Sequence, residues 1–284
     1  MRALPIFDMH MHTTASDGEL TPGQLVSLAV EREIEYLSIT DHDTVDAYDS
    51  FDDSVIRQIR LVPGIELSTS WRKIGVHVLG YGFDLGSPVL RQAVAAQQKA
   101  RYQRAEQIDQ RLVKAGFPGS LEWINARYPQ RCPGRPDFAA FLCHTGVVQH
   151  MDQAFKDYLG PGKLGDVRQH WLSLEDVIDC IRQSGGVAVL AHPLKYQLTN
   201  RKLRQLLTDF CTLGGSGLEV VSGWQDAQKT AYLTQLSGEF ELIATAGSDF
   251  HRCQTPWASL GRQTVTEATE HCVERIVSVS QLRW

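Results

Sequence analysis

The sequence predicts an α/β fold with a mostly parallel sheet, open or closed, and a helical insert. Short apolar segments alternate with helix-like segments along residues 1–86 and again along residues 166–284, a pattern typical of strands joined by crossover helices. Residues 87–165 contain no clear strand and several helix-like stretches. We therefore expect the two outer segments to form one core domain, with the helical insert between them.

Local signals justify the individual elements. Thr21 and Pro22 open an apolar stretch at helical spacing, which predicts a helix with a threonine cap. A longer helix should begin near residue 87 and end at Gly116, because glycine is favoured directly after a helix. The segment after Asp43 should also be helical. Strands are expected over residues 6–10, 35–41, 60–71, 75–82, 187–192, 217–222 and 241–249, and further helices over residues 121–128, 135–146, 152–160, 173–186, 200–212 and 225–236.

The composition is that of an ordinary globular chain. With 284 residues, of which 43% are hydrophobic, the chain can bury a substantial core. The net charge of −5 argues against a generally basic nucleic-acid binder. No apolar run approaches a membrane span, the opening is too short and too polar for a secretory signal, and the six cysteines form no CxxC pair. We therefore expect a reduced, cytoplasmic protein without a disulfide framework.

Six apolar segments have histidine or a carboxylate at or near their ends, at residues 6–12, 37–42, 61–66, 74–78, 187–192 and 242–251. His10 and His12 are two residues apart, so on a strand both imidazoles face the same side. Taken singly, other residues have structural interpretations: His77 as a core histidine and Asp17 as part of an Asp-Gly turn. Six such segments in one chain nevertheless predict a metal site, because side chains at the ends of neighbouring strands lie close together.

Nine side chains are candidate metal ligands, namely His10, His12, Asp17, His42, Glu66, His77, His192, Asp249 and His251. Nitrogen and carboxylate donors without thiolate suit Zn²⁺, Mn²⁺ or Fe²⁺, and nine donors are too many for one ion. Three divalent ions with three carboxylates would leave a formal charge of about +3, which favours an anionic substrate such as a phosphate ester. The other histidines, His144, His150, His170 and His271, are interpreted as structural.

The candidate ligands occur in an ordered series of short motifs: Asp8-Met9-His10-Met11-His12, Thr40-Asp41-His42, Gly64-Ile65-Glu66, His77, His192-Pro193 and Gly247-Ser248-Asp249-Phe250-His251. This series resembles the PHP (polymerase and histidinol phosphatase) family over essentially the whole chain apart from the insert. The resemblance implies a distorted (β/α)₇ TIM-like barrel with three divalent metal ions at the carboxyl ends of its strands.

The resemblance also implies how the ligands divide among the ions. His10, His12, Glu66 and Asp249 would hold the first ion, Glu66 would bridge to a second ion held by His77 and His192, and Asp17, His42 and His251 would hold the third. Histidinol phosphatases of the family tend to have histidine at the position of Asp17. The aspartate is more similar to the branch of 3′,5′-nucleoside bisphosphate phosphatases and 5′-3′ exoribonucleases.

The implied reaction is metal-assisted hydrolysis of a phosphomonoester. A hydroxide bridging two ions would attack phosphorus, and either Asp249 or His192 would pass a proton to the leaving oxygen. Asp8 and Asp41 are expected to orient the ligating imidazoles. The leading hypothesis is removal of the 3′-phosphate from a 3′,5′-nucleoside bisphosphate, such as adenosine 3′,5′-bisphosphate. The alternatives are exonuclease action on short 5′-phosphorylated RNA, histidinol-phosphate hydrolysis and a non-catalytic PHP module.

Substrate selection is expected to involve the insert. Arg135 follows a turn-rich stretch and could clamp a second phosphate, and Lys195 stands three residues after His192; the competing interpretation of each is a solvated charge. Trp224 and Phe250 are candidates for stacking on a base, with packing as the alternative. Glu219, within an apolar strand, could face the mouth of the barrel but is interpreted as structural. The expected partners are a small phosphorylated nucleotide or a short RNA, with no membrane and no protein partner.

Overall fold

Apolar segments from both outer parts of the chain form two sheets in the computed structural model, which describes residues 6–51, 59–129, 131–167, 171–255, 258–261, 263 and 265–280. The first sheet is parallel, with the order β1 (Phe7–Asp8), β2 (Tyr36–Leu37) and β3 (Arg60–Leu61). The second sheet has the order β4 (Gly64–Trp71), β5 (Ile74–Tyr81), β6 (Val187–Leu190), β7 (Gly217–Ser222) and β8 (Ile243–Gly247).

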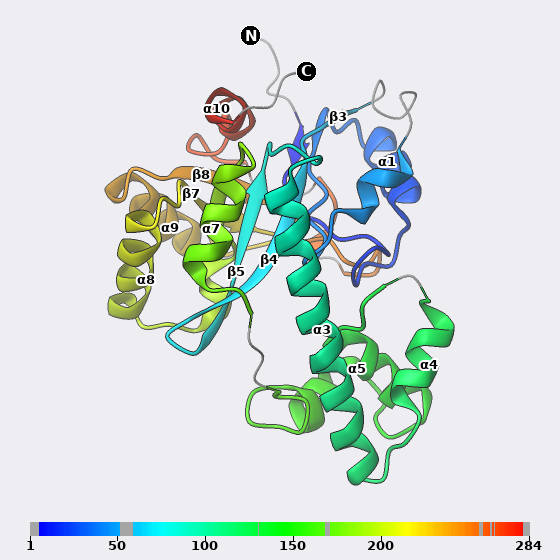
Figure 1. Cartoon of the computed structure of the whole chain (residues 1–284). Helices are drawn as coiled ribbons and strands as arrows, with labels where there is room; N and C mark the ends of the chain where they lie inside the picture. The colour runs from blue at the N-terminus through cyan, green and yellow to red at the C-terminus, as the bar shows by residue number, and fades with distance from the viewer. Residues whose placement is uncertain are drawn as a thin grey trace. The chain divides into compact units, whose positions relative to one another are not determined.

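The second sheet is mixed, which differs from the mostly parallel sheet that the sequence predicts. β4 and β5 form an antiparallel hairpin, which Figure 1 shows as two long neighbouring strands. β5 and β6 are also antiparallel, whereas β6, β7 and β8 run parallel. The hairpin turns at Arg72 and Lys73, whose φ values of 48° and 70° match the twist of the flanking strands. Neither residue is a glycine or an asparagine, so the usual sequence signal for such a turn is missing.

Two isolated parallel bridges link the sheets. Met11 pairs with Phe250, and His42 pairs with Glu66. The strands of the first sheet have only two residues each, which is too short for a continuous ladder with the second sheet. The mixed α/β class is therefore confirmed, whereas the described strands form no closed barrel.

The chain divides into two units, Met1–Val94 with Leu172–Trp284 and Ala95–Trp171. The first unit contains the sheets together with α1 (Pro22–Glu31), α7 (Leu174–Gln183), α8 (Asn200–Thr212), α9 (Ala227–Glu239), α10 (Cys272–Val279) and the short 3₁₀ helices η1 (Asp46–Ser50) and η3 (Pro193–Tyr196). The second unit contains most of α3 (Pro88–Lys114), with α4 (Ser120–Arg127), α5 (Arg135–His144), α6 (Met151–Ala154) and a short π-helix, η2 (Phe155–Leu159). The boundary between the units falls within α3 and not at residue 87.

Side-chain caps mark several helix starts. The Thr21 hydroxyl accepts a hydrogen bond of 3.3 Å from the Gln24 amide, as the sequence predicts, and Ser173 caps α7 in the same way. The helical segment expected after Asp43 is the short 3₁₀ helix η1. No helix in the described part of the chain has the length and apolar character needed to cross a membrane.

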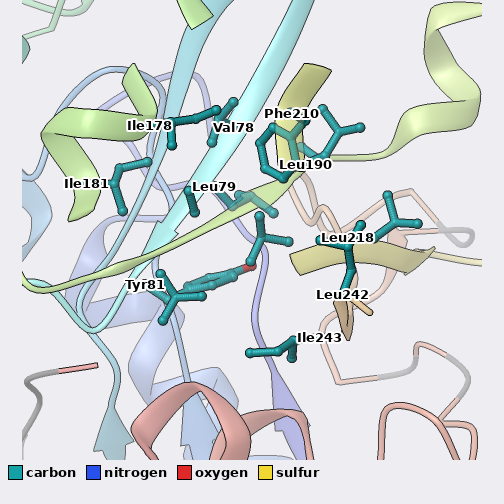
Figure 2. Close-up of a cluster of buried hydrophobic side chains, with 14 of the residues drawn as sticks. Val78, Leu79, Tyr81, Ile178, Ile181, Leu190, Phe210, Leu218, Leu242 and Ile243 are labelled. Atoms are coloured by element: carbon teal, nitrogen blue, oxygen red, sulfur yellow. The ribbon is translucent and has the colours of Figure 1, made fainter. Parts of the chain in front are cut away.

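The apolar core of the first unit lies between the second sheet and its helices. Figure 2 shows Val78 of β5 close to Ile178 of α7, and the same cluster includes Leu79, Leu190 and Phe210. All five side chains are fully buried, and burying a side chain of this size contributes about 1.5–3 kcal/mol. The second unit has a separate core that includes Ile108, Phe138 and Leu142.

Candidate metal centre

All nine candidate ligands lie together. Eight of them follow strand ends or lie on β4 and β5, and Asp17 lies in the loop after His12. Their donor atoms form four groups, each within 4.8 Å: His12-Asp17-His42-His251, His10-His12-Glu66, His10-His192-Asp249 and His42-Glu66-His77. Every candidate belongs to at least one group, and shared members connect the four groups into one cluster.

Glu66 is the common member of the cluster, and its side chain is fully buried. Its Oε1 lies 2.7 Å from Nδ1 of His77 and 2.8 Å from Nε2 of His192. Its Oε2 lies at 3.0 Å from Nδ1 of His42, 3.2 Å from Nε2 of His12 and 3.4 Å from Nε2 of His10. The two oxygens of one carboxylate thus face different sets of imidazoles.

Asp17 and Asp249 supply the other carboxylates. Oδ1 of Asp17 lies 3.4 Å from Nε2 of His251, and Oδ2 lies 3.9 Å from Nε2 of His42. Oδ1 of Asp249 lies 3.5 Å from Nε2 of both His10 and His12. Each carboxylate therefore has imidazoles on more than one side.

The carboxylates make the cluster favourable for positive charge. Burial alone would raise the pKa of Glu66, but the imidazoles of His42, His77 and His10 hold that pKa well below its usual range. Burial alone would lower the pKa of His12, yet Asp249 and Glu66 raise it to about 9. Buried carboxylates that stay ionised and raise the pKa of a neighbouring histidine are electrostatically suited to bind cations.

Several donor atoms of the cluster are buried without a hydrogen-bond partner. Among the described residues, this holds for Nδ1 of His42, Oε2 of Glu66 and Nδ1 of His192. Such atoms cost free energy unless a ligand satisfies them. Imidazole and carboxylate are also the donors that zinc, manganese and ferrous ions accept. The residues therefore fit divalent metal ions.

The backbone is strained at two of the candidate ligands. His192 has a φ of 22° and Asp249 a φ of 53°, in a region that residues with a β-carbon rarely adopt. Strain of this kind costs about 1–3 kcal/mol per residue and is concentrated at functional sites. Gly247 adds a steric constraint, because a β-carbon there would lie 2.3 Å from Cβ of His10. The strained backbone thus lowers the stability of the fold while it holds these side chains in place.

A fourth carboxylate, Glu219 on β7, positions two of the ligands. Its Oε1 lies 2.8 Å from Nδ1 of His10, and its Oε2 accepts a hydrogen bond of 2.6 Å from the backbone amide of His192. The sequence analysis interprets Glu219 as structural, whereas the structure places its carboxylate against two of the candidate ligands. A lone glutamate within the apolar strand Gly217–Ser222 was the available signal, since a buried carboxylate needs a partner.

Asp8 and Asp41 accept hydrogen bonds from loops of the site, and Asp8 also accepts one of 3.3 Å from the backbone amide of the candidate ligand His10. Asp8 accepts hydrogen bonds of 2.8 Å from the backbone amides of Ser248 and Gly261. Asp41 accepts hydrogen bonds from the backbone amide and hydroxyl of Thr13, at 2.7 and 2.6 Å. Both carboxylates thus hold segments next to the ligands.

The residues considered for substrate binding differ in their surroundings. Lys195 forms an ion pair with Asp249 although 56% of its side chain is exposed. Arg135 is the first residue of α5 in the second unit, where burial and the nearby charge of Arg101 lower its pKa. Phe250 is buried in an apolar cluster, which confirms the packing interpretation, whereas Trp224 is exposed.

The remaining described histidines belong to none of the four ligand groups. His144 stacks on Trp123 with ring centroids 5.1 Å apart, and His271 lies 3.5 Å from Glu270. His150 is exposed at the start of α6, and His170 lies outside the described residues.

The chain is similar to several known proteins in sequence and in structure. The PHP domain family model matches residues 8–121. The 5′-3′ exoribonuclease Rnm of Escherichia coli (strain K12) is 40% identical over 261 residues, which cover 91% of this chain and 89% of the relative. The 3′,5′-nucleoside bisphosphate phosphatase of Chromobacterium violaceum is 35% identical over 249 residues, covering 86% of each chain. A solved structure of an amidohydrolase from Chromobacterium violaceum, with bound sulfate and no metal, has a TM-score of 0.88 at 31% identity and covers 96% of both chains.

The matches to the family model and to the full-length relatives agree with the clustered imidazoles and carboxylates of the site. The chain therefore belongs to the PHP family of metal-dependent phosphoesterases and is an enzyme that acts on phosphate esters.

Proposed function

We propose that the protein removes the 3′-phosphate of 3′,5′-nucleoside bisphosphates to give the 5′-monophosphate and phosphate. The observation that carries this proposal is the convergence of nine nitrogen and oxygen donors into one cluster. Donor atoms left without hydrogen-bond partners in that cluster support a metal-bound state. The relative named as a 3′,5′-nucleoside bisphosphate phosphatase supports the substrate class.

In this proposal the cluster holds three divalent ions, which are manganese, zinc or ferrous ions. His10, His12, Glu66 and Asp249 would hold the first ion, Glu66 with His77 and His192 would hold the second, and Asp17, His42 and His251 would hold the third. The two faces of the Glu66 carboxylate, with His77 near Oε1 and His12 near Oε2, support a bridging role. When bound, such ions lower the pKa of coordinated water to about 7 and screen charge on the phosphate.

The two sheets are proposed to represent the distorted (β/α)₇ barrel that the family resemblance implies. The Met11–Phe250 and His42–Glu66 bridges support this arrangement, because each joins a segment after a strand of the first sheet to the second sheet. Both bridges include or adjoin candidate ligands, so the seams between the sheets coincide with the site.

Protonation of the leaving 3′-oxygen is assigned to Asp249 or His192. Both side chains belong to one ligand group with His10, and Lys195 pairs with the Asp249 carboxylate. The pH dependence of kcat distinguishes them, because replacing the residue that acts as the acid removes the alkaline limb of the profile. Asp249→Asn and His192→Gln are the two variants to compare.

Arg135 and Lys195 are proposed to bind the substrate phosphates. A guanidinium can hold a phosphate through two parallel hydrogen bonds, which suits Arg135 for the 5′-phosphate that is not hydrolysed. Lys195 would stand beside the phosphate that is removed, since it already contacts Asp249. The helical insert is thereby proposed to contribute to the substrate pocket.

Exonuclease action on short 5′-phosphorylated RNA is the second candidate. It is favoured by the 40% identity to a relative named as a 5′-3′ exoribonuclease. Both reactions break the bond between phosphorus and the 3′-oxygen of a 5′-phosphorylated nucleotide. They differ in whether that phosphorus carries a further nucleotide, so one catalytic centre serves either reaction.

A comparison of three substrates tests the proposal. Adenosine 3′,5′-bisphosphate, a 5′-phosphorylated oligoribonucleotide and histidinol phosphate are each supplied to the enzyme, and kcat/KM is measured. The proposal predicts the highest value for the bisphosphate. A higher value for the oligoribonucleotide identifies the exonuclease, and comparable turnover of histidinol phosphate contradicts nucleotide specificity.

The role of Arg135 has its own test. Arg135→Ala should raise KM for adenosine 3′,5′-bisphosphate by about 10- to 100-fold, because a charged hydrogen bond to phosphate is lost. KM for adenosine 3′-monophosphate should barely change. Arg127→Ala, which removes an exposed arginine of the same unit, is the control. Equal effects of Arg135→Ala on both substrates would exclude Arg135 from the 5′-phosphate site.

A further inference from the structure

A cavity of about 280 Å³ adjoins the metal centre, and the metal-binding residues do not account for most of its wall. The residues that line it include His192, Lys195, Ser222, Trp224 and Lys229. We call it the β7 cavity because Ser222 is the last residue of β7, and Trp224 and Lys229 come after this strand. His192 also belongs to a ligand group, so a molecule in the cavity lies next to the proposed site of hydrolysis. The volume is near the lower limit of about 300 Å³ for small-molecule sites, which suits one ring system better than a chain.

Trp224 presents its indole ring at the wall of this cavity. The residue is 75% exposed, the highest value among the exposed large apolar residues of the described chain. Single exposed apolar side chains are common, so exposure alone does not identify a site. The position of Trp224 at the β7 cavity is the second observation, and it indicates that a ligand could contact the ring.

The loop that carries Trp224 is anchored on both sides of the tryptophan. The Gly223 amide donates a hydrogen bond of 2.8 Å to the Gly247 carbonyl at the end of β8. The Gln225 side chain donates to the Val220 carbonyl at 2.8 Å and to the Thr230 hydroxyl at 3.0 Å. The exposed position of the ring is therefore imposed by the fold of this loop.

Polar groups of the cavity suit the sugar and phosphate of a nucleotide. Oγ of Ser222 is buried and has no hydrogen-bond partner among the described residues. Lys195 and Lys229 bring two ammonium groups to the wall. The carboxylate of Asp226 also lies there, but it accepts hydrogen bonds from the Gln228 and Lys229 amides as the cap of α9. The cavity thus combines an aromatic face, an unsatisfied hydroxyl and two cations.

We propose that the β7 cavity binds the nucleoside part of the substrate, with the base stacked on Trp224. Lys229 then lies beside the phosphate groups of the substrate. This inference rests on the proposed function, because it takes the substrate to be a nucleotide. Stacking on an aromatic side chain strengthens binding by about 5- to 150-fold and accepts every base. Trp224 therefore selects nucleotides over other phosphate esters while showing little preference among bases.

Kinetics of Trp224 variants test the stacking. Trp224→Ala should raise KM for adenosine 3′,5′-bisphosphate by about 5- to 150-fold and leave kcat and the KM of an abasic ribose bisphosphate unchanged. Trp224→Phe should retain most of the wild-type KM, because phenylalanine still offers an aromatic face. An equal change of KM for both substrates, or no change for either, would overturn the proposal.

Lys229→Ala tests the cationic part. It should raise KM for both bisphosphates several-fold, because the lost charge faces anionic groups that the two substrates share. Lys202→Ala is the matched control, since Lys202 is the third residue of α8 as Lys229 is of α9. If Lys229→Ala and Lys202→Ala change KM equally, Lys229 does not contribute to substrate binding in the cavity.

Binding of adenosine 5′-monophosphate separates this inference from the proposed function. The nucleotide should quench tryptophan fluorescence in the wild type, and most of the quenching should be lost in Trp224→Phe, although this variant still binds. If the wild type fails to hydrolyse the bisphosphate, the proposed function is refuted, while quenching that depends on Trp224 still supports stacking. Unchanged quenching in Trp224→Phe would place the base elsewhere.

Discussion

Glu66 and Leu67 are neighbours on β4, and both are fully buried. Their side chains nevertheless lie in two different environments. Leu67 lies in the apolar core of the first unit, while the carboxylate of Glu66 is surrounded by imidazoles. Successive side chains of a strand point to opposite faces, so one strand can serve both regions. The comparison shows that a single element supplies stability on one face and a charged site on the other.

The two regions make opposite contributions to the free energy of unfolding. Apolar side chains such as Leu67 stabilise the fold by leaving water. The site instead buries carboxylates, leaves donor atoms without partners and strains the backbone at His192 and Asp249. We therefore expect substitutions in the site and in the core to separate activity from stability.

The largest effect should come from Glu66→Gln. This change removes the negative charge shared by five imidazoles, so kcat/KM should fall by at least about 1000-fold, with less bound metal. Glu239→Gln, at an exposed glutamate of α9, is the control for losing a carboxylate. A Glu66→Gln enzyme with more than a tenth of wild-type activity would contradict the assignment.

Leu67→Ala should have the opposite signature. A cavity in the core should lower the free energy of unfolding by about 2–5 kcal/mol, measured by urea denaturation. Metal content and kcat of the folded protein should remain near wild type at temperatures well below its melting transition. Loss of metal without loss of stability would show that the two faces of β4 are not independent.

Glu219→Gln should give a smaller effect and sharpen the comparison. Glu219 lies on a core strand but reaches His10 and the His192 backbone. Weakening this support should reduce metal affinity or activity by about 10- to 100-fold, as is usual for residues that orient metal ligands. Metal titration of the variant beside Glu239→Gln measures the difference. If the Glu219→Gln variant binds metal with wild-type affinity, the role of Glu219 is purely structural.

The sequence predicted the members of the site better than their supports. The nine candidate ligands could be found because each stands at or near the end of an apolar segment, and His10 and His12 have strand spacing. Glu219 has no such spacing, and its contact with His10 arises because β7 and the segment after β1 come together only in the folded chain. The exposure of Trp224 likewise depends on hydrogen bonds of Gly223 and Gln225 that sequence patterns do not encode.

The direction of the strands was harder to predict than their presence. Residues 60–71 and 75–82 were expected to be strands; β4 lies within the first range, and β5 begins one residue before the second. Their antiparallel pairing depends on positive φ values at Arg72 and Lys73, which side chains with a β-carbon rarely adopt. The closed barrel was expected from the family resemblance, whereas the short strands β1 to β3 leave only isolated bridges to the second sheet.

The central claim is that the clustered imidazoles and carboxylates bind metal ions that hydrolysis requires. Its most direct test is to remove metal from the enzyme with a chelator, measure phosphate release from adenosine 3′,5′-bisphosphate, and restore Mn²⁺ while counting bound ions by elemental analysis. The account predicts that activity disappears without metal and returns as about three ions bind per chain. Undiminished turnover by protein that contains no metal would contradict it.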